Sequence, residues 1–139
     1  MTSIPSIETT VHKTHKLLNQ IASGHELIAD TQAAYDAFNA VMTTLRDRLT
    51  LESAHAIGAQ LTPLARGFYY EGWQPGNAPQ KLSREEFEAV VTEKLSGQYS
   101  WPVGEIIRVV ILAVGATIEP QTLQKLAAQV PDDVAALFA

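Results

Sequence analysis

The chain has 139 residues, of which 46% are hydrophobic and 18% charged, so it is long and apolar enough to bury a core as one globular domain. Its formal net charge of −5 argues against nucleic acid as the main partner, because binding phosphates requires a basic face. The sequence contains no cysteine, which excludes disulfides, thiolate zinc sites and cysteine nucleophiles and is consistent with a cytoplasmic protein.

The sequence offers no segment suited to a membrane. The N-terminal residues lack the apolar stretch of a signal peptide, and the most apolar run, residues 109–114, follows Arg108 and is too short to cross a bilayer. The β-branched residues of this run would also suit a strand, but no second candidate strand exists to pair with it. We therefore expect a buried helix and no membrane partner.

Periodic apolar positions predict four helices in the first half of the chain. The first covers residues 3–23 and carries a stripe at helical spacing: Ile4, Ile7, Val11, Leu18 and Ile21. Asp30 is a suitable N-cap for the second helix, and Thr50 for the third. A fourth begins at Thr62, with a proline in its first position, and ends before Gly72.

The second half begins after a loop at residues 74–80, which holds two prolines and a glycine. Ser83 and Glu86 have the spacing of a capping box and predict the start of the next helix. A helix over residues 102–118 follows, and Pro120 opens the first of two short helices that complete the chain.

The two halves align without a gap at an offset of 69 residues, the separation of Gln60 and Gln129. At this offset apolar positions coincide: Phe38 with Ile107, Val41 with Val110, Leu45 with Val114, Leu49 with Ile118, and Phe68-Tyr69 with Leu137-Phe138. The pattern predicts an all-α, single-domain helical bundle of two pseudo-repeated units. We divide the chain into a first half (1–73), a linker (74–82) and a second half (83–139).

One segment of the first half, AQLTPLARGFYYEGW, resembles the motif of the bacterial DUF2267 family of domains of unknown function. The positions that match are Gln60, Leu61, Arg66, Gly67, Tyr69, Tyr70, Glu71, Gly72 and Trp73. Thr62 stands where the family usually has proline, and a proline follows it. The resemblance extends over most of the chain. It implies a helical domain built from two related halves and brings no established activity, cofactor or catalytic residue.

The same segment holds the candidate binding residues Arg66, Tyr69, Tyr70, Glu71 and Trp73. Aromatic rings flanked by one arginine and one glutamate can line a pocket or anchor an interface. Alternatively, the rings pack the two halves together and present only their polar tips to solvent. Arg66 and Glu71 can likewise serve a ligand or hold the bend between two helices.

A second group of side chains could bind a metal ion, but its spacing also occurs by chance on many solvated helices. Glu8, His12 and His15 fall on one helical face, as a divalent-ion site would need. Two lysines close by favour an ordinary solvated face instead. We therefore predict no metal site and no cofactor.

The helix over residues 102–118 is apolar nearly all round, including Val109, Ile111 and Leu112 outside its main stripe. Either it is the central helix of the bundle or its surplus face forms a homo-oligomer contact. Since no coherent catalytic set is present, we expect a non-enzymatic module that binds another protein or self-associates. The alternative is a small-ligand-binding protein or enzyme with a pocket between the two halves near residues 66–73.

Overall fold

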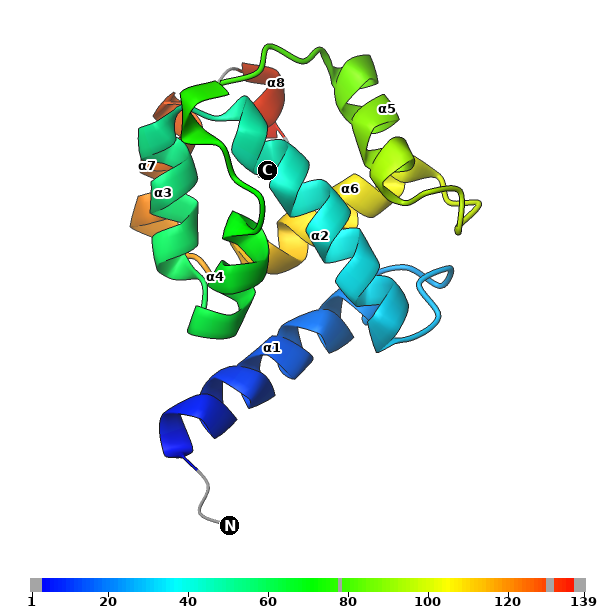
Figure 1. The fold of residues 1–139 in the computed structure, drawn as a ribbon, viewed down its shortest axis with the longest axis vertical. Coiled ribbons are helices and arrows are strands. Elements are labelled where there is room, and N and C mark those ends of the chain that lie inside the picture. Colours follow the sequence, from blue (N-terminus) through cyan, green and yellow to red (C-terminus); the bar gives the residue numbers. More distant parts are fainter. Residues whose placement is uncertain (1–3, 78, 130–131, 137–139) are drawn as a thin grey trace.

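The computed structural model describes residues 4–77, 79–129 and 132–136, and it is helical throughout, with no strand in these ranges (Figure 1). The elements in order are α1 (Pro5–Ser23), α2 (Thr31–Arg48), α3 (Leu51–Gln60), α4 (Pro63–Tyr70), the 3₁₀ turn η1 (Pro75–Asn77), α5 (Arg84–Lys94), α6 (Val103–Gly115), α7 (Pro120–Gln129) and α8 (Asp132–Ala135). The all-α prediction is confirmed. Within the described ranges, no helix has both the length and the hydropathy needed to span a membrane.

Local hydrogen bonds explain where the helices start. Asp30 accepts a bond from the Ala33 amide at 2.9 Å, and Thr50 accepts one from the Ser53 amide at 3.2 Å. The predicted capping box of α5 is present in both directions between Ser83 and Glu86. These starts therefore follow from short segments of sequence.

The start of α4 differs from the expected one. Thr62 occupies the N-cap position, but its own side chain makes no capping bond. Instead, the Thr10 hydroxyl of α1 accepts the Leu64 amide at 3.0 Å, and Thr14 lies 3.5 Å from the Thr62 hydroxyl. The first turn of α4 is thus satisfied from another helix, which holds α1 and α4 together.

The core forms where α2 packs against α1, α4, α5 and α6 (Figure 1). Residues 109–114 are helical and lie within α6, whose buried side chains are Ile106, Ile107, Val110, Ile111 and Val114. Of the surplus apolar positions, Ile111 is buried and Val109 half-buried, whereas Leu112 is 43% exposed. The central-helix alternative therefore describes α6, and little of its apolar surface is left for a partner.

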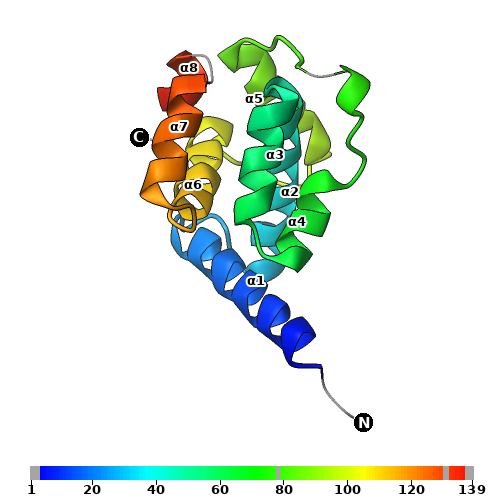
Figure 2. The same ribbon diagram turned by 90° about the vertical axis from the view of Figure 1, so that its left-hand side faces the viewer.

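The first helix continues beyond this core. Its C-terminal part buries Thr14, Leu17, Leu18 and Ile21, whereas its N-terminal part projects from the body of the molecule (Figures 1 and 2). On the projecting part Ile4 and Ile7 are each 55% exposed and Val11 is 37% exposed. Only the C-terminal part of the apolar stripe predicted from the sequence is therefore buried within the chain.

The linker is fixed to the end of α2 by two backbone contacts. The Gln80 amide donates to the Asp47 carbonyl at 2.7 Å, and Arg48 Nε donates to the Leu82 carbonyl at 2.6 Å. Arg48 also pairs with both carboxylate oxygens of Asp133, at 2.9 and 3.1 Å. One arginine thus ties the linker to the start of α8.

Some helix boundaries agree with the 69-residue offset, whereas those of α2 and α6 do not. α3 spans residues 51–60 and α7 spans 120–129, and α4 and α8 begin at residues 63 and 132. The aligned pair Leu137-Phe138 lies outside the described residues. The duplication itself stays a prediction.

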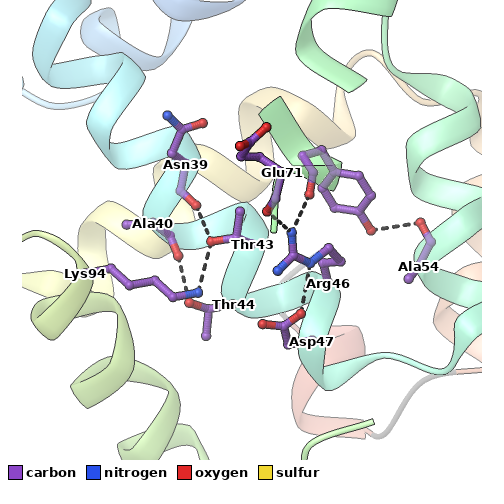
Figure 3. A network of polar contacts seen from close by, with 10 residues as sticks. Asn39, Ala40, Thr43, Thr44, Arg46, Asp47, Ala54, Glu71 and Lys94 are labelled. Atoms are coloured by element: carbon purple, nitrogen blue, oxygen red, sulfur yellow. Dashed lines mark hydrogen bonds and ion pairs between the residues drawn. The ribbon is translucent and has the colours of Figure 1, made fainter. Parts of the chain in front are cut away.

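A buried arginine holds the end of α4 (Figure 3). The Arg46 side chain is 5% exposed, and its Nη1 donates to the carbonyls of Tyr69 at 2.9 Å and Glu71 at 2.8 Å. Its Nε pairs with Asp47 at 2.9 Å. Because the last carbonyls of a helix have no partner within it, Arg46 completes α4 from α2.

Replacing Arg46 with methionine keeps an apolar stem but leaves these carbonyls without their donor. We expect the free energy of unfolding to fall by about 2–4 kcal/mol, because unpaired buried polar groups are costly. Urea denaturation followed by circular dichroism measures the loss.

The matched control is Arg84→Met, which removes an arginine from a solvated pair. Arg84 lies 3.6 Å from Glu88, and the two side chains are 72% and 36% exposed. This change should cost less than about 1 kcal/mol. Equal losses in the two variants would contradict the role given to Arg46.

Candidate functional site

The predicted binding residues do not form one site. Tyr69 is fully buried, and its hydroxyl donates to the Ala54 carbonyl at 2.8 Å. Burial raises the pKa of this phenol far above its ordinary value, and the neighbouring Tyr70 adds to the effect. Tyr69 lies in the core and links α3 to α4, so in this structure it faces no open surface.

Arg66 closes the bend between α3 and α4. Its Nε donates to the Gly58 carbonyl and its Nη2 to the Leu61 carbonyl, both at 2.9 Å. Both carbonyls lie at the end of α3, where that of Gly58 also accepts the Leu61 amide at 3.1 Å. Of the two sequence-based alternatives for Arg66, the geometry matches holding the bend, and its partners are carbonyls rather than Glu71.

Tyr70 and Trp73 form the half-buried part of the aromatic cluster. Their rings stack with centroids 5.2 Å apart and planes 14° apart, and Tyr70 Oη lies 3.5 Å from His55 Nδ1. Gly58 lies directly beneath the Tyr70 ring, where any side chain would overlap the phenol. The absence of a side chain at Gly58 therefore allows the hydroxyl end of the ring to approach the backbone of α3.

This stack borders a shallow hollow of about 440 Å³ lined by His55, Ala59, Arg66, Tyr70 and Trp73. All these residues belong to the first half of the chain. The indole Nε1 of Trp73 is buried and has no hydrogen-bond partner among the described residues. The hollow thus brings together three of the five predicted residues but does not lie between the halves.

A larger cavity, of about 630 Å³, does lie between the halves. It is enclosed by α2, by α4 and by the end of α5 and the residues after it, and its lining is Tyr35, Asp36, Asn39, Ala40, Thr43, Phe68, Glu71, Lys94, Leu95, Ser96 and Gln98. Glu71 is the one predicted binding residue in this lining. This cavity therefore lies between the halves, but its lining is not the set of residues predicted from the sequence.

The α2 side of this cavity carries a chain of hydrogen bonds (Figure 3). Lys94 Nζ donates to the Thr43 hydroxyl at 3.0 Å, and Thr43 donates to the Asn39 carbonyl at 2.6 Å. Burial lowers the pKa of Lys94, although the nearby Asp47 carboxylate opposes the shift. The Asn39 side-chain oxygen is buried without a partner among the described residues.

At the opening of the cavity, Asp36 accepts the Tyr99 hydroxyl at 2.7 Å, and this bond raises the pKa of Tyr99 to about 12. The sequence analysis missed these residues, although it contained a signal. Lys94 falls in the apolar stripe of its helix, next to Val91 and Leu95, which are buried. A lysine at such a position indicates either a buried partner or a cavity.

The histidine group on α1 has the solvated character expected of it. Glu8, His12 and His15 are all exposed. Within the part of the chain that the structure describes, no three histidine or carboxylate side chains are placed to hold a metal ion.

We expect Gly58→Ala to displace Tyr70 with little change in overall stability. Alanine favours the helix by about 1 kcal/mol, but its methyl group forces the phenol off α3 and away from Trp73. The measurement is Trp73 fluorescence in a Trp101→Phe background, with urea denaturation beside it. Gly67→Ala is the control, because open space surrounds Gly67. If both variants leave the fluorescence unchanged, the contact of Tyr70 with Gly58 is not as described.

Comparison with known proteins agrees with the resemblance noted from the motif. The family model described as "Uncharacterized conserved protein (DUF2267)" matches residues 14–137, and thus spans all the helices apart from the first part of α1. A comparison with curated proteins gives no match. Since the model covers nearly the whole sequence, this chain belongs to the DUF2267 family.

Proposed function

We propose that this protein is a non-enzymatic, cytoplasmic module that self-associates through the exposed face of α1. The observation that carries the proposal is the apolar stripe of Ile4, Ile7 and Val11, which projects from the body with 55%, 55% and 37% of these residues exposed. Large apolar side chains that share one face and lack a partner are typical of an interaction surface.

The position of this stripe favours a role particular to this chain. The match to the family model begins at residue 14, so all three exposed side chains precede it. The buried part of α1, from Thr14 onward, lies within the match. The family domain therefore includes the buried part of α1, and the projecting turns before it carry the proposed contact surface.

A second copy of the chain is the partner that we propose. The formal charge of the whole chain is −5, whereas α1 carries one glutamate and two lysines. Pairing through α1 therefore brings together the part of each copy that is not acidic, while the projection keeps the acidic bodies apart (Figure 2). Three side chains bury too little area for a permanent dimer, so the association is reversible.

The alignment of helix boundaries at 69 residues supports the further proposal that the chain arose by duplication of one helical unit. At this offset the projecting part of α1 corresponds to the linker, residues 74–80. The contact surface would then belong to the first unit alone.

Small-ligand binding is the second candidate function. In the hollow beside residues 66–73, Arg66 is already bonded to two carbonyls and Tyr70 is stacked on Trp73. The Trp73 indole nitrogen is the buried polar atom of this lining that has no partner among the described residues. The cavity between the halves offers more unused polar groups, and it favours this function more strongly than the hollow does.

Sedimentation velocity over a concentration series tests the proposed self-association. The wild-type chain should show a reversible dimer, and the double variant Ile7→Ser, Val11→Ser should raise its Kd at least roughly tenfold, since each buried apolar side chain contributes about 1.5–3 kcal/mol. Both positions are exposed, so circular dichroism should show that the helices are retained.

The matched control is Leu112→Ser on α6, which removes another exposed apolar side chain. It should leave the dimer unchanged. Loss of the dimer in this variant but not in the α1 variant would place the interface on α6. A wild-type chain that stays monomeric at high concentration would refute the proposal.

A further inference from the structure

The cavity between α2, α4 and α5 contains a polar group that the fold leaves unsatisfied. The side-chain oxygen of Asn39 is buried and has no hydrogen-bond partner among the described residues. Leaving such an acceptor unpaired costs about 1–3 kcal/mol, which a bound donor would recover. The Asn39 amide and the Glu71 carboxylate extend on the same side of α2, away from Lys94 (Figure 3). Asn39 and Glu71 both line the cavity, so the unmet acceptor belongs to the same site as a carboxylate.

The charges around the cavity favour a cation. Its lining holds two carboxylates, Asp36 and Glu71, against the single ammonium of Lys94. Lys94 is already bonded to Thr43, and Asp36 to Tyr99, so their charges are partly used within the chain. The Glu71 side chain is exposed and makes no hydrogen bond or ion pair within the described residues. It is the carboxylate that is available to a ligand.

Aromatic rings supply the apolar wall. Tyr35 of α2 and Phe68 of α4 meet edge to face, with centroids 5.1 Å apart and planes 83° apart, and both line the cavity. Ring faces attract cations as well as apolar groups. A volume of about 630 Å³ is in the range of small-molecule sites.

From these contacts we propose that the cavity binds a small organic amine in its protonated form. A turn of the Asn39 side chain presents its buried oxygen to the cavity that Asn39 lines. The ammonium group then donates to this oxygen and to the Glu71 carboxylate, and the apolar part of the ligand lies against Tyr35 and Phe68. This site is distinct from the exposed face of α1, and either proposal can fail without the other.

Three probes of similar shape but different charge test which polar group the cavity prefers: 2-phenylethylammonium, neutral 2-phenylethanol and anionic 3-phenylpropanoate. Calorimetric titration should give binding in the order ammonium, alcohol, carboxylate. In NMR spectra, the ammonium probe should shift the resonances of the Asn39 side-chain amide and the Tyr35 ring. Tighter binding of the carboxylate would show that Lys94 holds an anion instead, and failure of all three probes at roughly 10 mM would also overturn the proposal.

Substitutions test the assigned contacts. Glu71→Gln should weaken binding of the ammonium probe roughly fivefold to tenfold, because it removes a charge-assisted hydrogen bond near the surface. Glu93→Gln, an exposed glutamate on α5 outside the lining, is the matched control and should change the Kd less than about twofold. Equal effects of the two variants would contradict a direct contact with Glu71.

The acceptor is tested by two changes at one position. Asn39→Leu should weaken the ammonium probe about tenfold, and Asn39→Asp, which keeps the shape of the side chain, should tighten it severalfold. If the leucine variant does not fold, the aspartate variant decides, because unchanged or weaker binding would refute the contact with Asn39.

Discussion

The fold depends on a buried guanidinium that lies at the junction of two helices. Arg46 leaves the last turn of α2 and donates to two carbonyls at the end of α4. A buried charge is costly unless it is fully bonded, so this arginine is stable only where α4 ends beside it. Its pairing with Asp47 supplies the compensating charge. The position of α4 on α2, and with it every surface formed by α4, follows from this contact.

Once α4 is held there, successive residues of the family motif face different surroundings. Each step along a helix turns the side chain by about 100°. Arg66 thereby reaches the end of α3, Phe68 the cavity, Tyr69 the core and Tyr70 the outer hollow. A short segment that matches a family motif can therefore be mainly structural even though it is rich in aromatic and charged residues. The structure gives no steric reason for the glycine at 67.

Local sequence was enough to predict the helices, because their capping groups and apolar stripes lie within a few turns of each other. The contacts that could not be predicted from local sequence join residues far apart in the chain. Thr10 caps a helix that begins more than fifty residues later, and Arg46 bonds carbonyls 23 and 25 residues away. The lining of the cavity could not be predicted for the same reason: it includes Asn39 from α2 and Lys94 from α5, which no spacing rule connects.

The 69-residue offset explains why the proposed sites belong mainly to the first half. At this offset Gly115 stands for Arg46, Ala135 for Arg66 and Ala127 for Gly58. The second half therefore lacks counterparts of the two arginines and the glycine that position α4 and Tyr70 in the first half. It contributes packing instead, through α6 in the core and the end of α5 against the cavity. If the halves share an ancestor, the residues proposed to bind a ligand were kept or gained in the half whose corner is held by arginines, because a fixed corner positions side chains precisely.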